Sequence, residues 1–210
     1  MVCILRGEPS ATPKLWVGVI LVDDERCGLP LAGRTILEHV IERARPQVST
    51  LVLCTARDPS PLARHGLPVV APGFPGLLAA ILAGFDWTAA HSRETAWVAT
   101  FTADVPVFPG DLVERLGHAV GARGADMAWA EPGERSVPVF GLWPVRLRRA
   151  LGRALAKDPG LGVEEWAALY RPARVRFSPG TEPFMAVHEP QDLTLVERYL
   201  TSRARGSVVR

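Results

Sequence analysis

The chain has 210 residues, of which 48% are hydrophobic and 22% are charged, and its formal net charge is +2. A chain of this length and apolar content can bury a full core as one domain, and its composition argues against disorder. The near-balanced charge argues against nucleic acid as a partner, and no apolar run reaches the length that spans a membrane.

The cysteines and the chain ends indicate where such a protein works. The three cysteines show neither metal-ligand nor disulfide spacing: Cys3, Cys27 and Cys54. We therefore expect a reduced, cytoplasmic protein. The first dozen residues are too short and too polar for a signal peptide, so residues 1–14 are expected to be a loose N-terminal extension. One domain is expected over residues 15–200, followed by a basic C-terminal tail over 201–210.

Strand-like and helix-like segments alternate along the chain. Apolar, β-rich runs predict strands at residues 15–22, 50–55, 68–71, 95–102, 126–130, 137–143 and 173–178. Helical periodicity predicts helices at residues 36–44, 75–87, 111–120, 145–155 and 190–200. This alternation predicts an α/β protein with right-handed crossovers and a mostly parallel sheet that helices cover on both faces. The run at 137–143 follows 126–130 after a short turn, which favours an antiparallel pair or a strand added at the sheet edge.

The most informative carboxylate is Asp104, because ligands bind at the carboxyl ends of the strands in such a sheet. It follows the predicted strand 95–102, and Pro106 prevents that strand from continuing. A carboxylate in this position suits Mg²⁺, which prefers oxygen ligands and bridges to phosphates. The alternative is an aspartate that caps the turn leading into the next helix.

The turn after the first strand is acidic, with the sequence Asp23-Asp24-Glu25. In many nucleotide-binding α/β proteins this turn carries glycines and a cation instead. One interpretation is a short solvated turn that has no role toward phosphate. The other is that Asp23 or Asp24 joins Asp104 in a metal site, which would recruit phosphates through Mg²⁺.

Two further positions have two interpretations each. Gly76 precedes an almost entirely apolar helix, where a ligand could approach the free N–H groups of the helix start. It could equally be an ordinary start of a buried helix. His188 precedes the last predicted helix, and it either faces the site or belongs to the turn.

Taken together, these segments resemble the molybdenum cofactor guanylyltransferases (molybdopterin-guanine dinucleotide biosynthesis protein A). The resemblance covers residues 17–200 and is carried by the segments VGVILV, LPLAGRTILEHVIERARPQVSTLVL, GLPVVAPGFPGLLAAILAG, TADVP, RSVPVFGLWP and VHEPQDL. It implies a three-layer, Rossmann-like nucleotidyltransferase fold. It also implies Mg²⁺ as cofactor and a reaction of GTP or another NTP with molybdopterin, giving a dinucleotide cofactor and pyrophosphate.

The resemblance also implies roles for particular residues. Arg26 would be catalytic, by stabilising the pyrophosphate leaving group, and Asp104 would be the metal ligand. Nucleotide binding would fall on Leu21, Val22, Asp23, Arg26 and Gly76.

The chain departs from that family at several working positions. The family's long glycine-rich loop ends in Asp-Lys, whereas here the loop is shorter and Glu25 and Arg26 fall in those places. No lysine lies between Lys14 and Lys157 to replace the lost one. Residues of other types replace the family's asparagines and aspartate: Cys54, Pro72, Ala186 and His188. Losing such a loop removes several charge-assisted hydrogen bonds to phosphate, each of about 1.5–3 kcal/mol.

The sequence therefore leaves more than one function open. The first is a divergent nucleotidyltransferase with a degenerate nucleotide-binding loop. The second is a catalytically inactive relative that binds a molybdoenzyme, a maturation protein or another partner, because fold and function separate readily. A third is a transferase whose donor is not a triphosphate.

Overall fold

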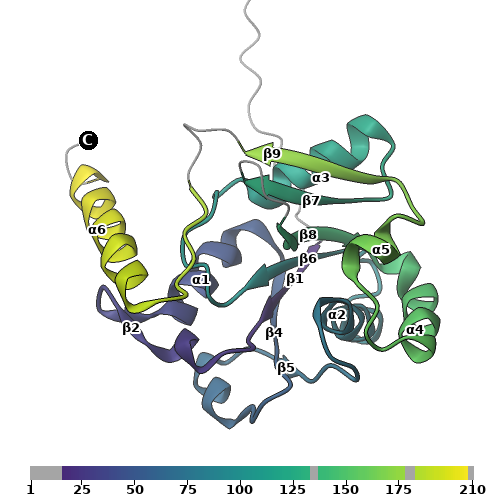
Figure 1. Ribbon diagram of the computed structural model, residues 1–210, viewed down its shortest axis with the longest axis horizontal. Coiled ribbons are helices and arrows are strands. Elements are labelled where there is room, and N and C mark those ends of the chain that lie inside the picture. Colours follow the sequence, from purple (N-terminus) through teal and green to yellow (C-terminus); the bar gives the residue numbers. More distant parts are fainter. Residues whose placement is uncertain (1–15, 133–136, 178–182, 208–210) are drawn as a thin grey trace, which may run out of the picture.

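The computed structural model describes residues 16–132, 137–177 and 183–207. In this part of the chain a seven-stranded sheet has the order β5–β4–β1–β6–β8–β7–β9 (Figure 1). Its strands are β1 (Trp16–Leu21), β4 (Thr50–Cys54), β5 (Val69–Val70), β6 (Trp97–Thr102), β7 (Met127–Pro132), β8 (Val137–Pro144) and β9 (Pro172–Phe177). Neighbouring strands are parallel, except that β8 runs antiparallel to both β6 and β7.

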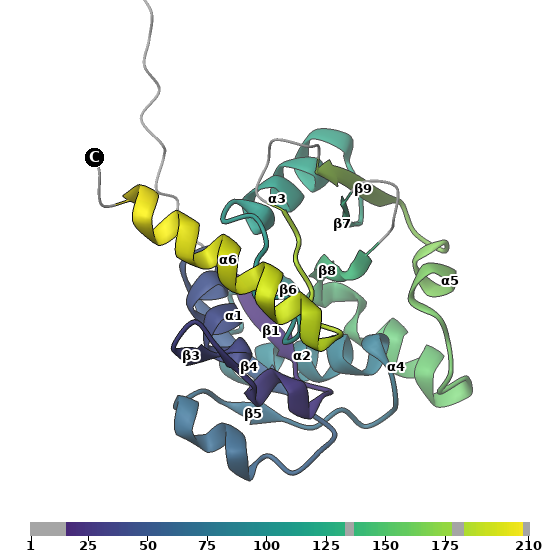
Figure 2. The same cartoon turned by 60° about the vertical axis from the view of Figure 1, so that its left-hand side comes forward.

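Helices cover both faces of the sheet. One face carries α1 (Ile36–Ala44) and α3 (Leu112–Arg123), and the other carries α2 (Leu77–His91), α4 (Arg148–Lys157) and α5 (Val163–Ala167). The last helix, α6 (Pro190–Ser207), stands apart from these layers (Figures 1 and 2). It shares a small core with the hairpin formed by β2 (Pro30–Leu31) and β3 (Arg34–Thr35). The predicted three-layer α/β architecture is confirmed.

Short 3₁₀ helices complete the connections. They are η1 (Glu25–Gly28), η2 (Arg45–Gln47), η3 (Ser60–His65) and η4 (Val145–Leu147). Two of them matter for the site, because η1 directly follows β1 and η3 follows β4. Both therefore lie at the carboxyl edge of the parallel strands.

Every predicted strand and helix has a counterpart in the structure, with three differences of detail. The antiparallel strand β8 lies inside the sheet, between β6 and β7, and not at the edge. The short helix α5 and the β2–β3 hairpin were not predicted. Helix α6 continues to Ser207, so part of the predicted tail is helical, while the predicted extension 1–14 lies outside the described residues.

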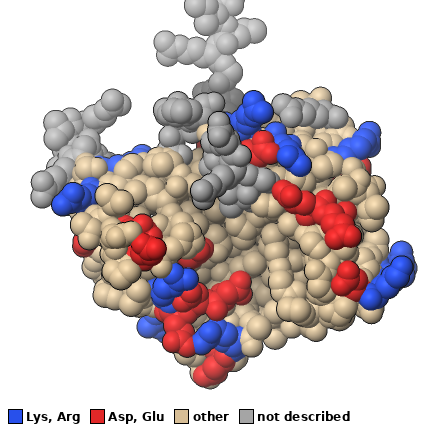
Figure 3. Space-filling view, viewed as in Figure 1, with Lys and Arg blue, Asp and Glu red and all other residues tan. Residues whose placement is uncertain are grey.

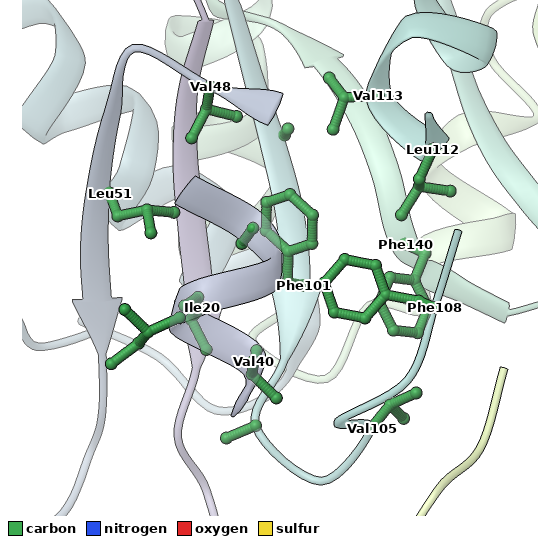
Figure 4. Packing of buried hydrophobic residues seen from close by; sticks show 14 of the residues in the cluster. Ile20, Val40, Val48, Leu51, Phe101, Val105, Phe108, Leu112, Val113 and Phe140 are labelled. Carbon is green, nitrogen blue, oxygen red and sulfur yellow. The ribbon is translucent and has the colours of Figure 1, made fainter. Parts of the chain in front are cut away.

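The central strand β1 is buried on both faces, which explains its continuous apolar sequence. Val19 packs in the core on the α2 side, and Ile20 packs in the core on the α1 side. On the α1 side, Phe101 and Phe108 place their ring centroids 5.5 Å apart, as do Phe108 and Phe140 (Figure 4). This packing joins β6, the segment that follows it and β8 on the α1 side of the sheet.

A buried amide connects α1 to α3. The Gln47 side chain is 2% exposed and donates to the carbonyls of Arg43 and Pro109 at 3.1 and 3.2 Å. Its carbonyl oxygen accepts from the N–H of Val113, in the first turn of α3, at 3.1 Å. Since a helix start has N–H groups without backbone partners, Gln47 serves as a remote cap. It thereby anchors the segment between β6 and α3.

Within the described residues, we find no helix that combines the length and the apolar character needed to cross a membrane.

Candidate active site

The order of the strands defines where a ligand would bind. Strand β1 lies between β4 and β6, and the chain leaves β1 through α1 on one face and enters β6 from α2 on the other. The crevice between the carboxyl ends of β1 and β6 is therefore the topological switch point of the sheet. Asp23 follows β1 and Asp104 follows β6, so the two carboxylates border this crevice. On the surface, acidic side chains with basic ones among them gather over the end of β1 (Figure 3).

Asp104 is held from several directions. The Thr102 hydroxyl donates to its carboxylate, and Nδ1 of His188 lies 3.6 Å from its other carboxylate oxygen. The N–H of Val187 donates to the Asp104 carbonyl at 2.8 Å. Helix α3 begins only after Asp111, so Asp104 does not cap that helix. The position and the partners of Asp104 support a functional carboxylate.

Asp23 faces the same crevice. Desolvation raises the pKa of its carboxyl, and the negative charges of Asp104 and Asp24 raise this pKa further. The two acids therefore lie close enough to repel each other, which a bound cation would relieve. In the described part of the chain, no three His, Cys, Asp or Glu side chains gather as a complete metal cage. Two carboxylates with water and substrate phosphates are, however, the usual ligand set of Mg²⁺, so the residues present fit such an ion.

Asp24, in contrast, belongs to the turn. Its carboxylate caps η1 by accepting from the N–H of Arg26 at 2.8 Å and from Nε of the same arginine at 2.6 Å. The side-chain hydrogen bond from Arg26, followed by the backbone one, lowers the pKa of Asp24. Of the two acids considered with Asp104, Asp23 is the one whose pKa the Asp104 charge raises, whereas Asp24 is committed to Arg26.

Arg26 links the turn after β1 to the chain before α6. Its guanidinium donates to the carbonyl of His188, while it also pairs with Asp24. The N–H groups of Arg26 and Cys27 are bonded to Asp24 as well, the second at 3.4 Å to its carbonyl. These two amides of the turn are thus already engaged and do not offer hydrogen bonds to a phosphate. A phosphate reaching this turn would meet the Arg26 cation, although Asp24 offsets part of its charge.

The remaining predicted residues lie elsewhere at the same edge. Leu21 and Val22 are 6% and 4% exposed, so their side chains belong to the core and only their backbone approaches the crevice. Gly76 begins α2 with φ 86° and ψ 178°, a conformation open almost only to glycine. The structure thus brings Arg26 and Asp104 to His188, with Asp23 near enough to Asp104 for the two charges to repel, and leaves Gly76 on the α2 side of the sheet.

Sequence reasoning missed two residues of this site. Thr102 holds Asp104, and its place two positions before the acid, at the end of a strand, was the available signal. Arg57 pairs with Glu25 across a gap of 32 residues, which no local pattern reveals.

The fold and the site together define a Rossmann-like nucleotidyltransferase with a carboxylate pair at the switch point. Residues 22–174 match the family described as the MobA-like NTP transferase domain, and the chain belongs to this family.

Curated relatives extend the match over most of the chain. The molybdenum cofactor guanylyltransferase of Nitrobacter hamburgensis is 43% identical over 172 residues, covering 80% of this chain and 82% of the relative. The enzyme of the same name from Bradyrhizobium sp. is 43% identical over 181 residues, covering 84% and 85%. The resemblance stated from the sequence is confirmed.

Solved structures confirm the fold. Molybdopterin-guanine dinucleotide biosynthesis protein A from Archaeoglobus fulgidus superposes with a TM-score of 0.68 at 15% identity, covering 89% of this chain and 99% of that one. A Mycobacterium tuberculosis protein solved in complex with manganese gives a TM-score of 0.61 at 15% identity, covering 87% and 98%. At this identity the superpositions show the fold alone.

Proposed function

We propose that this chain is a guanylyltransferase of the molybdenum cofactor, joining the GMP part of GTP to the phosphate of molybdopterin. The observation that carries the proposal is the carboxylate pair, Asp23 and Asp104, at the switch point of a sheet with this family's fold. The names of the curated relatives support the choice of GTP and molybdopterin. Cytoplasm is the proposed location.

The reaction is an in-line displacement at phosphorus. An oxygen of the molybdopterin phosphate forms a bond to the α-phosphorus of GTP, and the bond between that phosphorus and the β-phosphate oxygen breaks. The electron pair of the broken bond leaves with pyrophosphate. Because the acceptor phosphate is itself the nucleophile, no covalent intermediate with the protein is formed. The protein therefore contributes positioning and charge compensation.

The residues of the crevice supply that compensation. Asp104 and Asp23 would hold Mg²⁺, which when bound neutralises charge on the phosphates. Thr102 and the backbone of Val187 keep Asp104 in place. Arg26 would stabilise the leaving pyrophosphate, and its bond to the His188 carbonyl already holds its guanidinium against the segment before α6.

The alternative, a non-catalytic relative that binds a molybdoenzyme or a maturation protein, has one observation in its favour. Asp24 engages both the backbone and the guanidinium of Arg26, so the turn offers phosphate less positive charge than an uncompensated arginine would. A transfer assay separates the two functions directly.

The assay would follow pyrophosphate release and dinucleotide formation from molybdopterin, with GTP, CTP or ATP in the presence of Mg²⁺. The informative variant is Asp104→Asn, and the matched control is Asp111→Asn, because Asp111 is exposed and makes no side-chain cap bond. We expect activity with GTP, a loss of at least about 100-fold in Asp104→Asn, comparable to removal of one transition-state contact, and wild-type activity in the control. Absence of transfer with every nucleotide, or an unaffected Asp104→Asn, would refute the proposal.

A further inference from the structure

The outer side of α4 carries a row of cations. Arg149, Arg153 and Lys157 follow one another at every fourth position, so they lie on the same side of the helix, and all three are exposed. The opposite side of α4 is buried through Leu151 and Leu155. In the described part of the chain, the side chains of this basic row have no partner in an ion pair or a hydrogen bond.

This arrangement of charge is unfavourable for the helix by itself. Like charges four residues apart repel each other, and the first turn of α4 contains no acidic residue, which the helix dipole would favour there. Arg148 and Arg149 stand in that turn instead. Arg148 pairs with Asp86 of α2, whereas Arg149 has no such partner among the described residues. The basic row therefore does not stabilise the fold, and its charges are available to a partner.

Helix α5 lies beside α4 and carries the opposite charge (Figures 1 and 2). Its Glu164 and Glu165 are exposed, and their carboxylates also have no partner among the residues that the structure describes. Trp166 buries the other side of α5 in the same core as Leu151 and Leu155 of α4. Both helices lie at the margin of the molecule opposite α6, and Figure 3 shows basic and acidic side chains at that margin.

An exposed leucine follows the two acids. Leu169 is 75% exposed, the largest exposed fraction of any large hydrophobic residue in the described part of the chain. Its N–H donates to the carbonyl of Trp166 at 3.2 Å, which holds Leu169 against the end of α5. A single exposed leucine does not make an interface. Together with two sets of opposite charges, however, it gives this surface the apolar contact and polar surroundings of an interface.

We propose that the α4–α5 surface, defined by the basic row, the two acids and Leu169, binds a second copy of this chain across a two-fold axis. Such an axis places the basic row of each copy against the two acids of the other copy, so the same contact forms twice. Leu169 adds apolar area that leaves water on association.

The mixture of charges favours a second copy over other anionic partners. An acidic protein surface or a nucleic acid would be attracted by the basic row but repelled by Glu164 and Glu165. The formal net charge of the chain is only +2, which gives either of them little long-range attraction. A second copy satisfies both sets of charges in one orientation. Because α4 has 10 residues and α5 has 5, the contact is small, and we expect a weak dimer with a Kd of about 1–100 µM.

Sedimentation velocity of the full chain tests the proposal, at about 1–200 µM chain in low and in high salt. Two charge-reversal variants separate the halves of the contact. Arg149→Glu/Arg153→Glu makes the outer side of α4 net acidic like α5, and Glu164→Arg/Glu165→Arg makes α5 basic like α4. Each variant therefore repels its own copies, whereas a mixture of the two has opposite charges at both contacts. The control is Arg198→Glu, because Arg198 is exposed on α6. Circular dichroism checks that every variant is folded.

We expect the wild-type chain and the control to dimerise with similar Kd, and high salt to raise that Kd about tenfold because exposed charges are screened. Each reversal variant should stay monomeric alone, and the mixture should form a heterodimer. Leu169→Asp should weaken the dimer at least about tenfold, and its control is Leu195→Asp, at a leucine that is 56% exposed on α6.

Three results would overturn the proposal: a wild-type chain that is monomeric in both salts, a folded reversal variant that dimerises alone as tightly as wild type, or a mixture of folded variants that stays monomeric. The proposal goes beyond the transfer reaction and uses none of the crevice residues. Its outcome is therefore independent of the outcome of the transfer assay.

Discussion

Replacing Gln47 by leucine tests whether the buried amide holds the segment between β6 and α3. The substitution removes the hydrogen bonds to the carbonyls of Arg43 and Pro109 and the bond from the N–H of Val113. The Val113 amide would then be buried without an acceptor, at a cost of about 1–3 kcal/mol. The Pro109 carbonyl keeps its bond from the N–H of Leu112 at 3.2 Å.

The net effect follows from these terms. The two lost carbonyl bonds add roughly 0.5–1.5 kcal/mol each, and burial of the leucine side chain returns about 1.5–2 kcal/mol. We therefore expect Gln47→Leu to lower the free energy of unfolding by about 2 kcal/mol. For a chain of this length, such a loss lowers Tm by about 4–8 °C.

Urea unfolding followed by circular dichroism measures this change, and the slope of the transition shows whether the folded state stayed compact. The control is Gln191→Leu, because Gln191 is exposed at the start of α6 and its side chain bonds, within the described residues, to Glu189 alone. The control should stay within about 0.5 kcal/mol of wild type. A loss below 1 kcal/mol for Gln47→Leu, with an unchanged slope, would show that the amide does not act as a remote cap.

Two further predictions concern the turns at the carboxyl edge. Burial and the neighbouring acids raise the pKa of Asp23, so its carboxyl stabilises the fold below its ordinary pKa of 3.8, and this stabilisation is lost as pH rises through the raised value. Asp23→Asn should therefore have a higher Tm than wild type at pH 7, and it should lose the fall in Tm that accompanies ionisation of Asp23. Thermal scans from pH 3 to 8 measure both effects. An equal Tm at pH 7 would contradict the repulsion between Asp23 and its neighbouring acids. Gly76→Ala places a side chain at φ 86° and should lower the free energy of unfolding, measured in urea, by about 1–3 kcal/mol. The control is Gly73→Ala, where φ is not positive and the added methyl meets open space, and it should lose less than 1 kcal/mol. Equal losses in the two variants would indicate that the backbone at Gly76 relaxes freely.

Most of the fold could be predicted from hydrophobic period and length, because each long strand and helix buries a continuous face. The helix α5 (Val163–Ala167) is too short for its period to stand out, and its place depends on Trp166 packing in the core of the α2 side. The position of β8 inside the sheet also cannot be predicted from the local sequence pattern. The short turn before it favoured an antiparallel pair with β7 as one of two alternatives, and the structure forms that pair. Pairing with β6 depends on contacts between distant residues.

The site was predictable where a strand delivers a residue to the sheet edge, as it does for Asp23 and Asp104. The hydrogen bond from Arg26 could not be predicted, because its acceptor is the carbonyl of His188, which lies 162 positions away in the sequence. The different roles of Asp23 and Asp24 were equally hidden, since only the folded turn decides which carboxylate caps it. The following assignments to nucleotide and metal remain predictions: Leu21, Val22, Asp23, Arg26, Gly76 and Asp104.

The short stretch before α6 crosses the loop that carries Asp104. The N–H of Met185 bonds to the carbonyl of Val107 at 2.9 Å, and Val187 bonds in the same way to Asp104. The match to the family model covers residues 22–174 and stops before this stretch begins. A fragment cut at that point would retain Asp23 and Asp104 but lose the segment whose Met185 and Val187 bond to the loop that carries Asp104. A shortened chain can therefore contain every residue proposed to bind the metal and still lack the segment that holds one of them in place. Such a chain should be checked for that segment as well as for the acids.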